Sequence, residues 1–217
     1  MTGFRVLPGE SRRTYSPVCV RVVDDLSGEA PLGRVEAELD LEVSGQFEPT
    51  TIRAVRTMSG LFVYPDLGRA ADVTQPARNY RVRFKADYYD VVDAPVEFLA
   101  PPFNDTNPPA QVNKKITTVV LAPAVNYPFP THLRVLRGDV VDKVTKRPLP
   151  GAKVSEVGMA TVLCGAHGEF ALALRKAPLN GPADILAVHP ADAARVANPP
   201  VPLPESLKKN LRIEIDI

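Results

Sequence analysis

The fold is indicated by residues 140–154, which read VVDKVTKRPLPGAKV. An apolar run ends in Asp142, a polar turn follows, and a Pro-Leu-Pro-Gly segment leads into a second apolar run that reaches Val154. Asp side chains accept backbone N–H groups in turns, and glycine adopts turn conformations that other residues penalise. This stretch therefore predicts two β-strands joined by a turn.

The same pattern occurs earlier in the chain, where residues 22–35 read VVDDLSGEAPLGRV. In each half, a glycine turn and an alternating strand follow, with Phe62 in the first half and Phe170 in the second. Each half then continues with a further strand and a closing strand, at 80–86 and 116–121 in the first and at 184–189 and 211–216 in the second. Four matched blocks in the same order predict an internal repeat.

Residues 211–217 alternate strictly between apolar and charged side chains. Because successive side chains of a strand point to opposite faces, Ile213 and Ile215 are expected to face a core while their neighbours meet water. Residues 80–85 show the same alternation. One-sided burial of this kind is typical of antiparallel sheets that pack as a sandwich. We therefore predict an all-β chain of two tandem immunoglobulin-like or transthyretin-like antiparallel β-sandwich domains.

A proline-rich stretch at 123–130 separates the two halves. Proline-rich segments are stiff and extended, so this stretch is predicted to be a linker. The predicted organisation is a first domain at 1–125, a linker at 126–132 and a second domain at 133–217. Another segment rich in proline and asparagine, at 101–109, is predicted to project from the first domain as a loop.

Three motifs in the second half carry a resemblance to a known family. They are Arg137-Gly138-Asp139-Val140-Val141-Asp142, Pro148-Leu149-Pro150-Gly151-Ala152-Lys153-Val154, and Thr161 followed by Gly168-Glu169-Phe170. Their order resembles the carboxypeptidase regulatory-like domain, over 133–217 closely and over 16–122 more weakly. The resemblance implies a small, seven-stranded transthyretin-like β-sandwich in tandem. His167 departs from the family pattern, which usually has an acidic residue or Asn there.

Reactive side chains are few and lack the spacing of known active sites. The three histidines do not form a zinc-ligand motif, and the chain has no Gly-x-Ser-x-Gly nucleophile elbow. Cys19 and Cys164 lie in apolar, strand-like runs, where buried free thiols are expected. The calcium candidates lack the dense acidic spacing of a strong site; they are Asp24, Asp25, Asp87, Asp90 and Asp93. We predict no catalytic, cofactor-binding or metal site, and no enzyme.

The charge balance argues against a nucleic-acid partner. The 26 Lys and Arg residues and the 25 Asp and Glu residues give a formal net charge of +1 and no basic stripe. No run of about 18 apolar residues suits a membrane span, and the first residues lack the apolar centre of a signal peptide. The chain is therefore expected to be synthesised in the cytoplasm, with an extracellular or injection particle as the place of an assembled form.

Three functions from different classes remain. The first is a non-catalytic structural or adaptor subunit of a multiprotein assembly, such as a phage-tail-like contractile injection system. The second is a surface or carbohydrate- or ligand-binding module, and the third is an enzyme with an unrecognised site. Protein partners are expected at exposed strand edges and at the loop 99–110. The predicted contact residues are Leu99, Phe103, Ile213 and Ile215.

Overall fold

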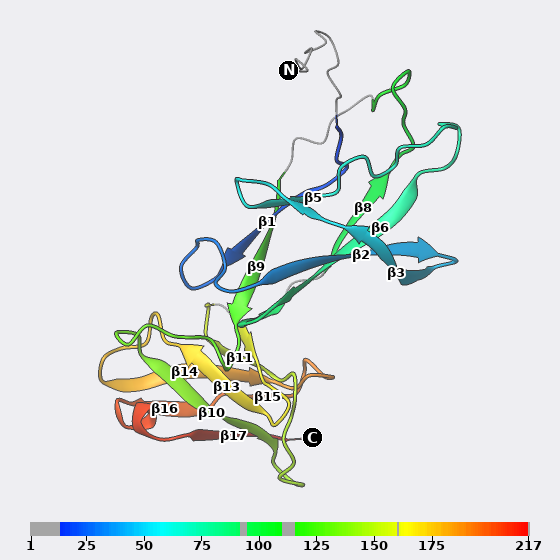
Figure 1. Ribbon diagram of the computed structural model, residues 1–217. Coiled ribbons are helices and arrows are strands. Elements are labelled where there is room, and N and C mark those ends of the chain that lie inside the picture. Colours follow the sequence, from blue (N-terminus) through cyan, green and yellow to red (C-terminus); the bar gives the residue numbers. More distant parts are fainter. Residues whose placement is uncertain (1–13, 92–94, 110–115, 160, 217) are drawn as a thin grey trace, which may run out of the picture. The chain divides into compact units, whose positions relative to one another are not determined.

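The computed structural model describes residues 14–91, 95–109, 116–159 and 161–216, and the prediction of an all-β chain is confirmed (Figure 1). The first nine strands are β1 (Cys19–Asp24), β2 (Val35–Val43), β3 (Gln46–Arg53), β4 (Val55–Arg56), β5 (Leu61–Val63), β6 (Arg78–Ala86), β7 (Tyr89–Val91), β8 (Val96–Ala100) and β9 (Thr117–Pro123). They are followed by β10 (Val135–Asp142), β11 (Lys153–Glu156), β12 (Thr161–Leu163), β13 (Glu169–Ala173), β14 (Gly181–Val188), β15 (Val196–Ala197), β16 (Pro200–Leu203), the 3-10 helix η1 (Glu205–Lys208) and β17 (Leu211–Ile215).

The strand order shows the predicted internal repeat. Strands β1 to β9 are ordered β3-β2-β6-β7-β9-β1-β5-β4, with β8 beside β6. The later strands form a three-stranded sheet, β13-β10-β17, and a five-stranded sheet, β12-β11-β14-β15, with β16 beside β14. In both sets the first strand lies between the closing strand and the strand after the glycine turn: β1 lies between β9 and β5, and β10 lies between β17 and β13. The second strand is also placed equivalently: β2 lies between β3 and β6, and β11 lies between β12 and β14. The short strand β7 has no counterpart, and it joins β6 to β9 in one sheet.

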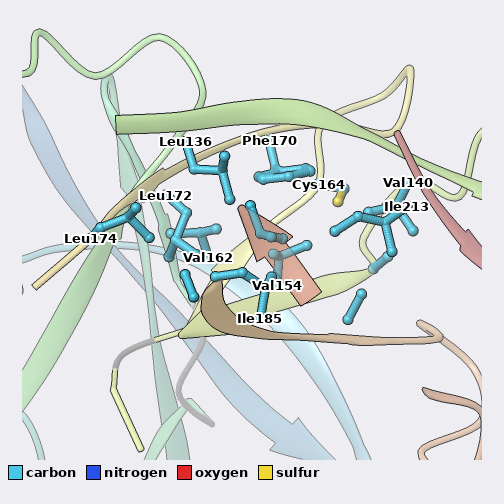
Figure 2. Packing of buried hydrophobic residues seen from close by; sticks show 14 of the residues in the cluster. Leu136, Val140, Val154, Val162, Cys164, Phe170, Leu172, Leu174, Ile185 and Ile213 are labelled. Atoms are coloured by element: carbon cyan, nitrogen blue, oxygen red, sulfur yellow. The ribbon is translucent and has the colours of Figure 1, made fainter. Parts of the chain in front are cut away.

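The hydrophobic core of the later strands lies between their two sheets. Leu136 and Phe170 come from the three-stranded sheet, Val154 and Ile185 come from the five-stranded sheet, and all four are buried (Figure 2). Leu149, Val154 and Phe170, which belong to the motifs of the second half, are all buried. Full burial of one such side chain contributes about 1.5–3 kcal/mol relative to leaving it in water.

One pair of strands departs from the expected antiparallel pattern. Strand β10 pairs antiparallel with β13 but parallel with β17, with Val140 opposite Ile213. The alternation of side chains shows which face of the sheet each residue occupies. It does not show the direction of the strand, because a strand alternates in the same way in either direction. The sandwich of β10 to β17 is therefore mixed, which the sequence pattern could not reveal.

The chain divides into two compact units, each made of several segments. Unit 1 comprises Met1–Val20, Glu38–Val82 and Val96–Thr117, and unit 2 comprises Arg21–Ala37, Arg83–Pro95 and Thr118–Ile217. Four of the five borders fall inside β1, β2, β6 and β9, and the fifth lies directly before β8. The prediction of domains at 1–125 and 133–217 means that each segment folds independently. The division into compact units does not measure independent folding, so the domain boundaries stay a prediction.

Equivalent aspartates hold equivalent turns in the two repeats. Asp24 Oδ1 accepts the backbone N–H of Leu26 at 2.7 Å, and Asp142 Oδ1 accepts those of Val144 and Thr145 at 2.6 and 2.8 Å. The predicted turn function of Asp142 is confirmed. The hydrogen bond from the Thr145 backbone, together with that from Val144, lowers the pKa of Asp142 below its usual value because both favour the charged carboxylate.

A buried cluster of two tyrosines and one aspartate lies in unit 2. Asp24 Oδ2 accepts the hydroxyl of Tyr89 at 3.0 Å and that of Tyr127 at 2.7 Å. Burial, followed by the hydrogen bond to Asp24, raises the pKa of Tyr127 above its usual value. Tyr127 belongs to the predicted linker at 126–132. This part of the linker is therefore anchored by a buried side chain, which its proline content did not indicate.

Candidate functional site

Three of the four predicted contact residues have buried side chains. Phe103 is 3% exposed, Ile213 is 1% exposed and Ile215 is fully buried, whereas Leu99 is 62% exposed. Ile213 and Ile215 point into the core, as their alternation predicts, so a partner at this edge would meet the backbone of β17. The contacts expected at Phe103 and along this strand stay predictions. Leu99 keeps the exposure that the prediction requires, and its contact with a partner stays a prediction.

Strand β17 presents charges to solvent while its isoleucines fill the core. Cross-strand ion pairs join Arg212 to Asp139 at 2.9 Å, Glu214 to Lys146 at 2.7 Å and Asp216 to Lys143 at 2.8 Å. A partner strand would therefore meet the backbone edge and the charged face of β17. Ile217, the last residue of the predicted strand, lies outside the described residues.

Phe103 is the anchor that holds two loops of unit 1 together. Its ring lies 5.5 Å from that of Tyr15, and the Arg69 guanidinium lies over it at 5.2 Å. Its N–H donates to the carbonyl of Gly68 at 3.0 Å, and its carbonyl accepts the N–H of Ala70 at 2.9 Å. The loop between β5 and β6 is thereby fixed against the segment that follows β8.

Arg69 strengthens the same contact by pairing with acids from both loops. Its guanidinium donates to Asp105 at 2.8 Å and to Asp66 at 3.2 Å. The hydrogen bond to Asp105 is the main cause that raises the pKa of Arg69 above its usual value. Because these pairs are partly solvent-exposed, their contribution to stability is small. They fix the geometry of the loops more than they add to the free energy of folding.

The pinned loops enclose two hollows in unit 1. The first, named the apolar groove, has a volume of about 160 Å³ and is lined mainly by Tyr15, Pro17, Leu67, Leu99, Pro101 and Pro109, with Phe103 in its wall. The second, named the polar cleft, has a volume of about 400 Å³, and its polar lining consists of Asp66, Arg69, Gln75 and Arg78. Ala100 and Pro102 line the cleft whereas Leu99 and Pro101 line the groove, so the two hollows lie on alternate sides of this extended segment.

Most residues of the apolar groove were not predicted from the sequence. Tyr15 and Pro17 precede β1, Leu67 follows β5, and Pro101 follows β8, so no local pattern connects them. Leu99 was identified because an apolar residue beside a proline-rich loop suggests a contact. The other groove residues could have been found only with knowledge of which loops meet.

Cys164 is not placed to act as a nucleophile. Burial raises the pKa of the Cys164 thiol to about 12, so the sulfur stays protonated and weakly reactive at neutral pH. His167, three residues away, is exposed on the turn. Within the described ranges, no group of three or more His, Cys, Asp or Glu side chains is placed to hold a metal ion. Asp93, one of the calcium candidates, lies outside those ranges.

No helix in the part of the chain that the structure describes is long and apolar enough to cross a membrane.

Comparison with known proteins gives matches to solved structures only. No family model matches the chain, and no curated protein matches it. The chain is similar to a Streptococcal ancillary pilin at 15% identity and a TM-score of 0.31, over 92% of this chain and 62% of that chain. It is also similar to the shaft pilin SpaA from Lactobacillus rhamnosus GG at 12% identity and a TM-score of 0.32, over 94% of this chain and 97% of that chain. The Bacillus anthracis TIE protein matches at 9% identity and a TM-score of 0.30, over 94% and 33%.

These values are too low to assign a shared function. The chain spans 62% of the length of the ancillary pilin. The specific resemblance to the carboxypeptidase regulatory-like domain stays a prediction, because no family model supports it.

Proposed function

We propose that the chain is a non-catalytic structural or adaptor subunit of a multiprotein assembly, and that it contacts a protein partner through the apolar groove. The observation that carries the proposal is Leu99, a large apolar side chain that is 62% exposed at a hollow with fixed walls. Exposed apolar surface beside a preformed hollow is typical of protein–protein contact sites.

The walls of the groove support this proposal because they are organised before any partner binds. The Phe103 backbone is hydrogen-bonded to Gly68 and Ala70, and its ring packs against Tyr15. A site that is ordered in advance loses less conformational entropy on binding, so a small apolar contact yields more affinity. The particular assembly that we propose, from the sequence, is a phage-tail-like contractile injection system.

The test is a mild purification of the tagged chain from its native host, followed by mass spectrometry. We expect the same companion subunits in a fixed ratio, and we expect Leu99→Asp to remove them. Leu179→Asp is the matched control, because Leu179 is 74% exposed and does not line the groove. Recovery of tube, sheath or baseplate-like subunits would support the injection-system form of the proposal.

Two results would count against the adaptor proposal. Companions that remain bound to the Leu99→Asp chain would show that the groove is not the contact. A chain that purifies as a monomer without companions, or with a sugar polymer or a small ligand, would favour the alternative of a ligand-binding surface module.

A further inference from the structure

The β4–β5 hairpin presents a fully exposed methionine on a well-ordered turn. Met58 is 108% exposed relative to the reference state for its residue type, the highest value among the described large apolar side chains. The neighbouring Thr57 receives two hydrogen bonds from the turn, from the N–H of Gly60 to its carbonyl and from the N–H of Leu61 to its Oγ1. Its hydroxyl also lies 2.9 Å from that of Ser59. The backbone therefore holds Met58 out into solvent.

An exposed methionine on a rigid turn and an apolar groove complement each other in kind. Methionine is flexible and polarizable, and it adapts to irregular apolar surfaces. The groove, at about 160 Å³, is lined by proline, leucine and aromatic side chains. Both features belong to unit 1, and Met58 is not among the residues that line the groove. Each copy of the chain thus carries a projection and a hollow of matching chemistry.

The charges around the two features are also complementary. The hairpin and its approach, residues 51–63, contain Arg53 and Arg56 and no acidic residue. Residues 95–109, which supply Leu99, contain no basic residue, and of their two acids Asp105 is paired with Arg69 whereas Glu97 lies near Leu99. Glu97 lies two positions before Leu99 on β8, and therefore on the same face of the strand. A positive hairpin is attracted to Glu97, beside the groove, which favours the insertion of Met58 there.

We propose that the chain associates head to tail with a second copy of itself, with Met58 of one copy inserted into the apolar groove of the next. The inference rests on the proposed function and identifies its partner as another copy of this chain. Because the projection and the hollow are different surfaces, the contact is heterologous, and each added copy again offers one free projection and one free groove. The product is an open chain of subunits unless the geometry closes a ring.

The association between isolated copies is expected to be weak. Stable interfaces bury roughly 1,200–2,000 Å² in total, and one inserted side chain with its rim supplies only a part of that area. Sedimentation of the wild-type full chain should show oligomers that increase with protein concentration. Added salt should reduce them, because the rim charges are exposed to solvent.

The test uses two variants that each damage one side of the contact. Met58→Asp removes the projection and places a carboxylate against Glu97, whereas Leu99→Asp places a charge in the groove. Each variant alone should be monomeric. An equimolar mixture should form a one-to-one dimer and nothing larger, since only one intact projection and one intact groove remain. Val144→Asp is the matched control, because Val144 is 73% exposed in unit 2, and it should associate like the wild type.

Three outcomes would overturn the head-to-tail contact. The first is a wild-type chain that is monomeric at every concentration, and the second is a mixture of the two variants that stays monomeric. The third is a Val144→Asp control that is as monomeric as the two variants, which would show that their effect is not specific to the hairpin and the groove. If the Leu99→Asp chain nevertheless loses its assembly companions in the native host, the proposed adaptor function stands and only the self-association fails.

Discussion

The side chain of Asp142 organises a turn, and its contribution to stability depends on pH. Its carboxylate accepts two backbone N–H groups of residues 144 and 145, which lie directly after β10. These bonds are stronger with the charged form, so the pKa of Asp142 in the folded protein is lowered. In the unfolded chain, the carboxyl group has an ordinary pKa of about 3.9.

The stabilisation from Asp142 is therefore expected to depend on pH with a definite sign. It is fully present above about pH 4–5 and is lost as the pH falls through the folded pKa, since protonation removes the charged acceptor. We expect Asp142→Asn to be less stable than the wild type at neutral pH, with a difference that shrinks below about pH 4. Urea unfolding of both proteins between pH 2 and 7 measures it. A difference that grows on acidification would contradict this account.

At the scale of the structural elements, Gly68 determines how closely the β5–β6 loop approaches the segment after β8. Its φ is +96°, and a Cβ at this position would lie 2.6 Å from the carbonyl oxygen of Pro101. Both the backbone conformation and the contact therefore require glycine. The apolar groove depends on this approach, since Leu67 and Pro101 line it together.

Alanine substitutions at Gly68 and at a second glycine can separate the cost of backbone strain from the cost of steric overlap with Pro101. Gly68→Ala should destabilise the protein by at least about 1–2 kcal/mol. Gly45→Ala is the control, because Gly45 also has a positive φ, +82°, while nothing lies within 4 Å of its added Cβ. Chemical denaturation of both variants gives the difference due to the Pro101 contact. Equal losses for the two variants would show that the loops can separate without cost.

Phe170 provides the corresponding test of the core between the two later sheets. It is 1% exposed and comes from β13, in the cluster with Leu136 and Val154. Phe170→Ala should destabilise by about 3–5 kcal/mol, since a buried aromatic side chain is removed and a cavity remains. Val144→Ala, at a 73% exposed position, should change stability by less than about 0.5 kcal/mol. A loss near zero for Phe170 would mean that the core is not packed as described.

At the scale of the whole molecule, the repeat could be predicted from the sequence while the contacts between distant segments could not. The alternation in 211–216 and the turns at Asp24 and Asp142 are local patterns, and the structure has them in their predicted form. The parallel direction of β17 and the joining strand β7 depend on distant neighbours. The burial of Phe103 could not be predicted for the same reason: its proline-rich surroundings are typical of a loop, whereas Tyr15 and Arg69, which pack against it, come from distant parts of the sequence.

The predicted second domain can be tested as a separate fragment. The hydrophobic cluster of β10 to β17 is formed by residues between Leu136 and Ile215 alone. We expect a fragment of residues 133–217 to fold and to unfold cooperatively, as measured by circular dichroism during thermal denaturation. A fragment that is unfolded under conditions where the full chain is folded would show that segments of unit 2 from the first half are required, and the boundary at 126–132 would be wrong.

The parallel pairing of β10 with β17 has a consequence for the chain while it is being synthesised. Strand β10 is complete when Asp142 is added, but its second edge is covered only by residues 211–215. Translation adds about 5–20 residues per second, so the roughly seventy intervening residues leave that edge uncovered for on the order of 4 to 14 seconds. During this interval, neighbouring nascent chains on one messenger RNA can pair through it. Slower translation of this region should therefore increase aggregation of the newly made protein, rather than improve its folding.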